Sequence, residues 1–539
     1  MTAPTRRGGF SRSLRCRKVL PAALGALLPL VPLVATSAWA DSVVIPRAER
    51  IEVDPGVQLS ADVYKSSADG RSPLIIIPPG YGIPNLTNAV SAAKLASKGY
   101  DVVVYAPRGQ YASSGENNLI AAADIGDVSK IIDWAGTHLD SDTTRVGMTG
   151  VSQGSVISVM AAANDPRIRA VAAMSTSSTT ATPLMVNNTW FSQFIQLVKA
   201  AQLVNPFGPE LATVIDKFDH NDRSGLSEIF SVRSAQSRVA ELNKNAPAIL
   251  IENGWQDSAF PPSGVTSFFD QLTTPKRMML MPGDHVVPEL GGFGGLPNES
   301  WDAAGDWFDH FLHGIDNGIN EGKPVQLQPL FGGPFTGFDS WQASVSPTDR
   351  RILGPLADAE RGAGELGAAS ATTWSKSIVG GPNPGADSGP LILAGLGAPR
   401  HVTFPGFLNA VDRSRAAVWE TTPTTADRTI SGAPALSVTV TPSDAAFSIF
   451  SYLYDIDENG GATLLGHIPF TATDIEAGIP IAVDVSFQPV RYTVQAGHRL
   501  ALVVDTEDER YESETALGER LTFESTSASP AVLDVPWQQ

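Results

Sequence analysis

The residues most suited to chemistry are Gly150-Val151-Ser152-Gln153-Gly154, a Gly-x-Ser-x-Gly pattern. A strand-like run, 145–149, precedes it, and a helix-like run rich in small apolar residues, 153–164, follows it. In such a setting the serine occupies a sharp turn, the nucleophile elbow, which exposes its hydroxyl for attack on a carbonyl. The pattern predicts a serine hydrolase with Ser152 as nucleophile. Taken alone, it also fits an ordinary glycine-rich turn, so the partners of the serine must separate the two interpretations.

A serine hydroxyl needs a base to accept its proton, and in α/β-hydrolases the partners follow in the order Ser, Asp or Glu, His. Of the eight histidines, His285 stands alone in the expected place, a loop just after the strand-like run 278–281. The other seven stand before the serine, in an expected insertion, on the last helix or in the C-terminal region: His138, His220, His310, His313, His401, His467 and His498. We therefore predict that His285 is the base.

The acid is expected after the strand that precedes the histidine's strand. Residues 248–252 form an apolar run, and a glycine turn then leads to Asp257. The distance from Asp257 to His285 leaves room for one helix and one strand, so we predict that Asp257 is the acid. Asp284 is a rival, but neighbours in a loop seldom point at each other, and we interpret it as a turn or cap residue. Glu252, inside the strand, is the second rival.

The oxyanion formed during acyl transfer needs N–H donors aimed at it. The backbone of Gln153, the residue after the nucleophile, is one predicted donor, because the first N–H groups of a helix have no partner within it. The loop that follows the run 74–77 contains Gly80 and Tyr81 and is predicted to supply another. A plain Gly/Pro turn is the alternative interpretation of this loop.

The elements that would position these residues alternate along the chain. Short apolar runs and longer helical patterns follow one another over residues 41–315, which predicts an α/β-hydrolase domain with a largely parallel sheet and an antiparallel start. Between about 178 and 245 the alternation breaks, and a helical cap is predicted there. Residues 316–343 are predicted to be a linker. Alternating apolar residues then predict an all-β jelly-roll sandwich over residues 344–539.

The N-terminus and the composition limit the partners that the protein is expected to have. Residues 1–40 combine a basic start, an apolar stretch and the small-x-small site 38–40, which predicts a secretory signal peptide and a secreted or periplasmic protein; Arg6-Arg7 hints at twin-arginine export. Its removal takes away six basic residues and lowers the formal charge from −18 to −24. Nucleic acid and anionic membranes should repel such a chain, and no further membrane span is expected. The only cysteine, Cys16, lies in this peptide, so the mature chain has no disulfide and no thiolate ligand.

Two acidic stretches invite other interpretations. Residues 455–460, Asp-Ile-Asp-Glu-Asn-Gly, resemble the start of a calcium loop, but Gly466 stands where the final glutamate ligand is required. A hairpin turn between two strands is the preferred interpretation. The run 505–509 is interpreted as a solvated loop. Neither a metal nor a cofactor is predicted.

The chain resembles the X-Pro dipeptidyl-peptidase (S15) and cocaine esterase-like α/β-hydrolase family. The segments that carry the resemblance are 53–62, 107–115, the elbow, 254–257, 307–314 and 497–502. The resemblance implies a Ser152–His285–Asp257 triad, acyl-enzyme chemistry on esters or amides and a jelly-roll C-terminal domain. In some relatives a tyrosine hydroxyl also donates to the oxyanion, and Tyr81 would match it. Proline-specific peptidases of the family are larger, which favours an esterase or acylase.

Three hypotheses about function remain. The chain is a secreted carboxylic-ester hydrolase acting on a small ester or amide substrate, a dipeptidyl-peptidase or amide acylase with the same triad, or a non-catalytic binding protein. The complete triad argues against the third. An apolar cap favours an acyl or aromatic substrate, and the sequence carries no signal for oligomeric state.

Overall fold

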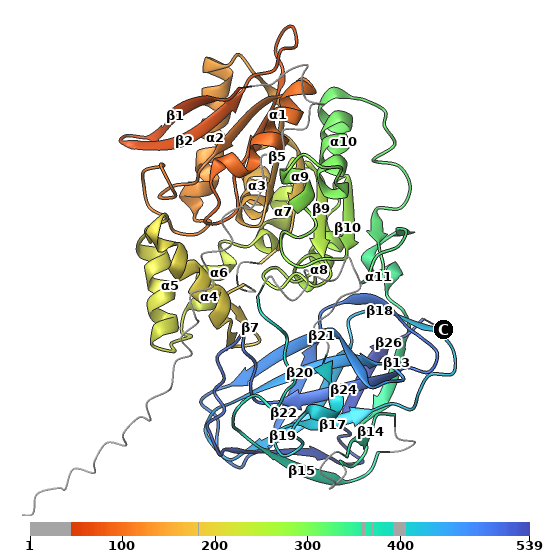
Figure 1. Ribbon diagram of the computed structural model, residues 1–539. Coiled ribbons are helices and arrows are strands. Elements are labelled where there is room, and N and C mark those ends of the chain that lie inside the picture. The colour runs from red at the N-terminus through yellow and green to blue at the C-terminus, as the bar shows by residue number, and fades with distance from the viewer. Residues whose placement is uncertain are drawn as a thin grey trace, which may run out of the picture. The chain divides into compact units, whose positions relative to one another are not determined.

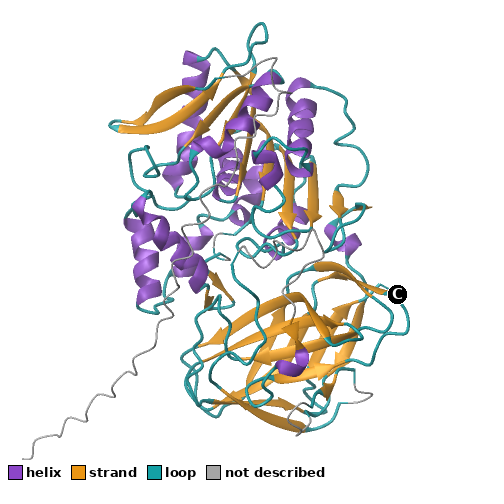
Figure 2. Cartoon of the chain, viewed as in Figure 1, coloured by secondary structure: helices purple, strands orange, loops and turns teal. Residues whose placement is uncertain are grey.

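The computed structural model describes residues 45–179, 181, 183–356, 362–367, 371–391 and 406–538. The predicted signal peptide, residues 1–40, and His401 lie outside these ranges. The described residues belong to one structural unit, in which an N-terminal α/β region and a C-terminal β-rich region can be distinguished (Figures 1 and 2).

A sheet with ten described strands is the scaffold of the N-terminal region, in the order β1-β2-β4-β3-β5-β6-β9-β10-β11-β12. Its core strands, β3 through β6 with β9 and β10, run parallel, whereas β1, β2 and β4 pair antiparallel, as predicted. The strands are β1 (Arg47–Asp54), β2 (Val57–Tyr64), β3 (Pro73–Ile77), β4 (Asp101–Tyr105), β5 (Asp142–Val151), β6 (Ile168–Met174), β9 (Ala248–Gly254), β10 (Lys276–Met281), β11 (Val325–Leu327) and β12 (Thr336–Phe338).

Helices cover both faces of this sheet (Figure 1), which explains why its central strands are apolar on both sides. In β3, Leu74 and Ile76 join the core under α2, α3 and α8, whereas Ile75 and Ile77 join the core under α1 and α10. The helices of this region are α1 (Ala89–Ser97), α2 (Ala122–His138), α3 (Gln153–Asn164), α8 (Ser263–Gln271), α9 (Leu290–Phe293), α10 (Glu299–His313) and the 3-10 helix η2 (Asn85–Asn88).

The predicted linker, residues 316–343, contains regular structure. Strands β11 and β12 extend the large sheet, with β11 parallel to β10, and the short helix α11 (Trp341–Ser344) follows them. The segment that leads to the C-terminal region is therefore partly built into the sheet.

A helical insertion follows β6, where the cap was predicted. Its elements are β7 (Met185–Val186), β8 (Thr189–Trp190), α4 (Ser192–Ala200), η3 (Ala201–Leu203), α5 (Pro209–Asp219), α6 (Leu226–Ser231), η4 (Ala235–Arg238) and α7 (Val239–Asn245). The helices α4, α5 and α6 share a small apolar core of their own that includes Trp190, Ile195, Leu211, Phe218 and Phe230. Ile195 and Val198 of α4 are buried in this core.

Among the described residues, the C-terminal region contains two six-stranded sheets. One consists of β13 (Thr348–Ile352), β26 (Val532–Pro536), β19 (Ala435–Pro442), β25 (Arg520–Ser525), β15 (Trp374–Val379) and β22 (Ile481–Ser486). The other consists of β14 (Gly364–Glu365), β17 (Ala417–Glu420), β24 (Arg499–Asp505), β20 (Phe447–Ile456), β21 (Gly461–Ala472) and β16 (Gly406–Phe407). The 3-10 helix η6 (Leu408–Ala410) and the strand pair β18 (Arg428–Gly432) and β23 (Val490–Val494) complete the region.

The structure confirms one of the two interpretations of the acidic stretches and contradicts the other. Residues 457–460 form the turn between the antiparallel strands β20 and β21, so the hairpin interpretation is confirmed. The solvated-loop interpretation of residues 505–509 is wrong, because Asp505 and Asp508 are fully buried. Asp508 accepts hydrogen bonds from the Tyr452 hydroxyl (2.9 Å) and from the Ser388 backbone and hydroxyl (3.0 and 2.9 Å), so this run organises the interior of the region.

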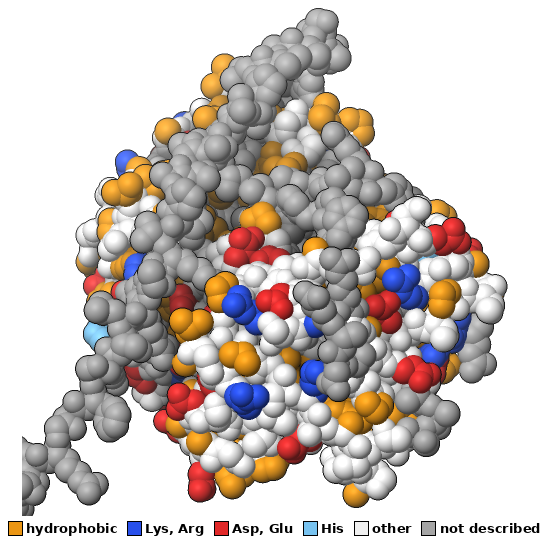
Figure 3. All heavy atoms as spheres, turned by 60° about the horizontal axis from the view of Figure 1, so that its bottom comes forward, with side chains coloured by type: hydrophobic (Ala, Val, Ile, Leu, Met, Phe, Trp, Pro, Cys, Tyr) orange, Lys and Arg blue, Asp and Glu red, His pale blue; other side chains and the backbone are white. Residues whose placement is uncertain are grey.

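The surface carries no separate patch of one charge on the face that Figure 3 shows, where acidic and basic side chains are interspersed among the described residues. Within the described ranges, no helix combines the length and the apolar composition that crossing a bilayer requires.

Candidate active site

Ser152 occupies a sharp turn between β5 and α3. Its backbone has φ 60° and ψ −127°, a left-handed φ that a residue with a side chain rarely adopts. The flanking glycines are required because the chain passes close to itself. A Cβ on Gly154 would lie 1.9 Å from the Pro78 carbonyl oxygen, and one on Gly150 would lie 2.8 Å from the same atom. The Gly-x-Ser-x-Gly pattern therefore has a steric cause.

His285 and Asp257 meet this serine in one hydrogen-bonded row. His285 Nε2 lies 2.8 Å from Ser152 Oγ, and His285 Nδ1 lies 3.0 and 2.9 Å from the two carboxylate oxygens of Asp257. Both partners are buried, whereas Ser152 is partly exposed. The structure thus brings together the three residues that the sequence singled out.

The loop after β9 fixes Asp257. Its Oδ1 accepts the backbone N–H groups of Ala259 (3.0 Å) and Phe260 (2.6 Å), which leaves the carboxylate facing the imidazole. The Phe260 ring packs edge-on against the His285 ring, with centroids 5.0 Å apart. Contacts of this kind hold both side chains in one orientation.

Burial is the largest single influence on the pKa of Asp257 and on that of His285. It raises the pKa of Asp257, although the adjacent His285 opposes the shift. Burial alone would lower the pKa of His285, but the Asp257 carboxylate, with smaller contributions from Glu289 and Asp284, raises that pKa above its ordinary value of 6.5. An imidazole with a raised pKa is the stronger proton acceptor.

Asp284, the first rival for the acid, makes a different contact. Its Oδ1 accepts the backbone N–H groups of Ser258 and of His285, each at 2.7 Å. Asp284 therefore ties the loop that carries Asp257 to the loop that carries His285. Glu252, the second rival, lies fully buried in β9 and interacts with Glu289.

The predicted oxyanion residues lie beside the nucleophile. A Cβ on Gly80 would lie 3.6 Å from the Ser152 Cβ, so the loop after β3 borders the elbow directly. Gln153 begins α3, and its backbone N–H has no acceptor within the helix. The Tyr81 hydroxyl accepts a hydrogen bond from Asn117 Nδ2 at 3.1 Å, and burial raises its pKa to about 12, so the hydroxyl keeps its proton and can donate it.

Two residues of this site were not predicted individually, Gln110 and Asn117. Gln110 Nε2 donates to Gln153 Oε1 at 3.3 Å, and the Gln153 Nε2 group has no acceptor among the described residues although it is buried. Both belong to the loop that follows β4. The segment 107–115, part of the family resemblance, was the available signal for Gln110, whereas Asn117 lies just beyond it.

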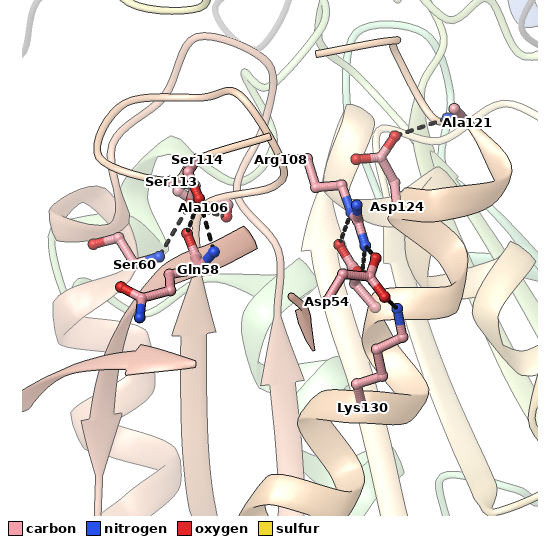
Figure 4. A network of polar contacts seen from close by, with 11 residues as sticks. Asp54, Gln58, Ser60, Ala106, Arg108, Ser113, Ser114, Ala121, Asp124 and Lys130 are labelled. Atoms are coloured by element: carbon pink, nitrogen blue, oxygen red, sulfur yellow. Dashed lines mark hydrogen bonds and ion pairs between the residues drawn. The ribbon is translucent and has the colours of Figure 1, made fainter. Parts of the chain in front are cut away.

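A polar network anchors this loop (Figure 4). Arg108 contacts Asp54 and Asp127, and Lys130 Nζ reaches Asp54 at 2.8 Å, so the loop is tied to α2 and to the end of β1. At the other end, the Ser113 hydroxyl donates to the Ala106 carbonyl at 2.7 Å. The serine-rich end of this segment thus serves to position the residues beside Tyr81 and Gln153.

A cavity of about 310 Å³ adjoins the loop after β9. Residues from the three parts of the chain line it, among them Val186 of the cap, Trp255 and Asp257 of the catalytic region, and His467 and Arg510 of the C-terminal region. Neither Ser152 nor His285 lines this cavity, so we do not assign it as the site of acyl transfer.

The cap docks on the C-terminal region through buried polar contacts. Arg223 Nη2 lies 3.1 Å from Glu514 Oε1, and Asn221 Nδ2 donates to the same oxygen at 2.8 Å. The Thr189 hydroxyl also meets the Thr471 hydroxyl at 2.7 Å. The C-terminal region therefore contributes to the position of the cap.

The described residues include no group of three His, Cys, Asp or Glu side chains arranged to hold a metal ion. The triad row, the elbow glycines and the N–H groups at the start of α3 are an arrangement that can perform acyl transfer without further groups.

Two family models match separate parts of this chain. The model for X-Pro dipeptidyl-peptidase (S15 family) matches residues 55–205. The model for the X-Pro dipeptidyl-peptidase C-terminal non-catalytic domain matches residues 317–529. The first match covers the N-terminal region as far as the cap, and the second covers β11, β12 and most of the C-terminal region.

Solved structures with the same fold span nearly the whole chain. A CocE/NonD family hydrolase from Staphylococcus aureus has a TM-score of 0.71 at 13% identity, covering 94% of this chain and 99% of that one. An aminopeptidase from the marine sediment archaeon Thaumarchaeota archaeon has 0.68 at 13% identity, covering 92% and 96%. An α-amino acid ester hydrolase has 0.66 at 16% identity, covering 95% and 100%.

Curated relatives match over shorter stretches. The uncharacterized protein YcjY of Escherichia coli is 32% identical over 128 residues, which is 23% of this chain and 42% of that protein. An uncharacterized 31.7 kDa protein of Escherichia coli is 31% identical over 103 residues, which is 19% of this chain and 36% of that protein. The chain thus spans less than half the length of the curated relatives it matches.

Proposed function

We propose that the chain is a secreted serine hydrolase of the X-Pro dipeptidyl-peptidase (S15) and CocE/NonD group of α/β-hydrolases and that it cleaves carboxylic esters. The observation that carries the proposal is the row Ser152 Oγ–His285 Nε2–His285 Nδ1–Asp257, with contacts of 2.8 to 3.0 Å. This row supplies a nucleophile, a base and an acid that orients the base.

In the proposed reaction Ser152 Oγ attacks the ester carbonyl carbon while His285 Nε2 takes its proton. The carbonyl oxygen becomes an oxyanion, which the backbone N–H of Gln153 and a donor of the Gly80–Tyr81 loop stabilise. The C–O bond to the alcohol then breaks, and His285 returns its proton to the leaving oxygen. Water, deprotonated by His285, then attacks the acyl–Ser152 ester. His285 returns this proton to Ser152 Oγ as the acyl–oxygen bond breaks, which releases the acid and restores the serine. Asp257 stays ionised and stabilises the imidazolium in both steps.

The neutral polar groups beside the elbow favour an ester over a peptide N-terminus. Recognition of a free α-ammonium requires a carboxylate or several oriented acceptors. The Gln110 amide hydrogen-bonds the Gln153 side chain, and the Asn117 amide hydrogen-bonds the Tyr81 hydroxyl. The buried Asp284 accepts two backbone N–H groups. These contacts support an uncharged acyl group at the site.

Peptide or amide hydrolysis with the same triad is the second candidate. The match to the X-Pro dipeptidyl-peptidase model favours it, since the chemistry differs only in the leaving group. Secretion follows from the predicted signal peptide, and N-terminal sequencing of exported protein should begin at Asp41.

Labelling with a fluorophosphonate tests the proposal directly. The mature protein should react at Ser152, and the Ser152→Ala variant should not react. Ser97→Ala, which changes an exposed serine of α1, should label like the wild type. A panel of p-nitrophenyl esters and X-Pro p-nitroanilides then separates the candidates. No labelling of the mature protein, or equal labelling of wild type and Ser152→Ala, would contradict the proposal. No labelling of either protein would support a non-catalytic binding protein.

A further inference from the structure

Two carboxyl groups lie fully buried behind the triad and have no part in the proposed reaction. Glu252 lies in β9, where it pairs in register with Met174 of β6 and Met279 of β10, and Glu289 lies at the start of α9, just after the His285 loop. None of their four carboxylate oxygens makes a hydrogen bond of ordinary length and angle with the described residues. Ionised carboxylates in such a place would leave every lone pair unsatisfied.

The two side chains interact with each other. Burial raises the pKa of Glu252 well above its ordinary value, and the neighbouring Glu289 raises it further. Burial likewise raises the pKa of Glu289, while the neighbouring Glu252 carboxyl opposes the shift. Two carboxyls in contact cannot both ionise without a compensating cation, and a shared proton gives each of them a partner.

The pair borders the histidine loop. The Ser175 hydroxyl, which follows β6, accepts the backbone N–H of Val286 at 3.1 Å and also reaches Glu289. Ser175 and Val286 both have left-handed backbones, with φ of 41° and 68°, so this loop is held in an unusual conformation. Glu289 acts electrostatically on His285 itself.

The other groups that face the pair come from three directions. Asp257 acts on Glu252 from the loop after β9, and the Ser300 hydroxyl approaches from α10. Asp284 and His285 belong to the loop after β10. Of the charged groups that act most strongly on the pair, His285 alone becomes a cation.

We propose that Glu252 and Glu289 are positioning residues that share one proton and hold a single negative charge behind His285. That charge stabilises the imidazolium formed when Ser152 attacks, and the shared hydrogen bond fixes the loop that carries the imidazole. Its catalytic consequence rests on the proposed function, whereas the charge state of the pair does not.

Glutamine substitutions distinguish one charge from two or none. A glutamine amide can donate to the remaining carboxylate as the shared proton does, so Glu252→Gln and Glu289→Gln each preserve one hydrogen bond and one negative charge. The double variant Glu252→Gln/Glu289→Gln keeps an amide–amide hydrogen bond and has no charge. The single variants should therefore resemble the wild type, and the double variant should not.

The first measurement is the pH dependence of kcat/KM with an ester substrate. We expect the midpoint of the acid limb to stay within about 0.2 pH unit in the single variants and to fall by about one pH unit in the double variant. Glu241→Gln, which changes an exposed glutamate of α7, is the matched control and should leave the midpoint unchanged.

The second measurement does not need activity. NMR titration of ¹³Cε1-labelled histidine, with His285 assigned from a His285→Gln variant, should show the same pattern of midpoints in a Ser152→Ala background. Titration of ¹³Cδ-labelled glutamate in the wild type should show one carboxyl of the pair still protonated at neutral pH. This second readout holds even when the double variant fails to fold or the protein hydrolyses no ester.

Two patterns would overturn the proposal. The first is a single variant that lowers the titration midpoint of His285 by half as much as the double variant does, with both glutamates of the wild type ionised at neutral pH. This pattern would show that the pair carries two charges. The second is an unchanged His285 midpoint in every variant, with both glutamates of the wild type protonated at neutral pH. This pattern would show that the pair is neutral. Loss of hydrolysis and of probe labelling with the expected titrations intact would contradict the proposed function alone.

Discussion

Gly154 faces the Pro78 carbonyl oxygen so closely that a methyl group on its Cα would lie 1.9 Å from that oxygen. Pro78 lies in the loop after β3 and Gly154 lies in the first turn of α3, and these segments follow the neighbouring parallel strands β3 and β5. Their contact holds the predicted oxyanion loop against the elbow. The glycine is therefore required for the spacing between Ser152 and Gly80, and not for helix formation.

Gly154→Ala should consequently disrupt the site and destabilise the fold by about 2–3 kcal/mol, the cost of forcing extra volume into a packed region. Fluorophosphonate labelling and urea denaturation would measure the two effects. Gly126→Ala in α2 is the matched control, because nothing lies within 4 Å of its added Cβ. It should raise stability by about 0.5–1 kcal/mol, since alanine favours a helix interior. Similar behaviour of the two variants would contradict the steric argument.

Asp257→Asn should lower kcat about 10³- to 10⁴-fold with little change in KM. The amide oxygen can keep the backbone contacts with Ala259 and Phe260, but the amide no longer stabilises the imidazolium or selects its tautomer. Steady-state kinetics on an ester would measure this loss. Asp284→Asn changes an equally buried aspartate whose Oδ1 accepts the backbone N–H groups of Ser258 and His285, contacts that an amide oxygen can keep, so it should stay within a few-fold of the wild type. A larger loss for Asp284→Asn than for Asp257→Asn would reverse the assignment of the acid.

The activity should fall in acid because His285 must be neutral to accept the serine proton. Burial lowers the pKa of His285, but Asp257 and the other nearby carboxylates raise it above 6.5, so kcat/KM should reach half its plateau above pH 6.5 and decline as the pH drops further. Rate measurements from pH 5 to 9 at constant ionic strength would locate the midpoint. A half-maximal pH below 6.5 would show that desolvation outweighs the carboxylate.

Much of the fold was predictable because its signals are local. The run Leu74–Ile77 and the pattern of α3 identify their elements without tertiary information, and the order Ser152, Asp257, His285 identifies the site. Strands β11 and β12 were not predicted, because each has three residues and too short a period to detect. Their place in the sheet depends on pairing with β10.

Other features depend on contacts between distant residues. The burial of Asp508 could not be predicted, because its partners Ser388 and Tyr452 come from separate segments and its neighbours in sequence are charged. For the same reason Glu252 could be weighed only as a rival acid. Its interaction with Glu289 becomes apparent only when β9 and the histidine loop are placed together.

The Glu252–Glu289 pair should also make stability depend on pH. The folded-state pKa of Glu252 lies above its unfolded value, so above about pH 4.3 the unfolded chain releases a proton that the folded chain keeps. Stability is then lost as the pH rises, by up to about 1.4 kcal/mol per pH unit for one proton. Glu252→Gln removes this titration and should flatten the decline between about pH 5 and 8, whereas the exposed Glu241→Gln should not. Urea denaturation at several pH values would measure the slopes, and identical slopes for wild type and Glu252→Gln would contradict the pairing.

The docking of the cap should depend on Glu514, whose side chain is 3% exposed and contacts both Arg223 and Asn221. Glu514→Gln leaves the Arg223 guanidinium, 12% exposed, without its carboxylate, and removing one member of a buried ion pair costs about 3–5 kcal/mol. We expect a loss of this size in urea denaturation, with faster proteolysis within the cap. Asp339→Asn, which breaks the exposed pair with Lys323, should cost less than about 1 kcal/mol. If Glu514→Gln proved as mild as Asp339→Asn, the C-terminal region would not hold the cap through this contact. The cap would then depend on the apolar contacts of Phe191 with Tyr511.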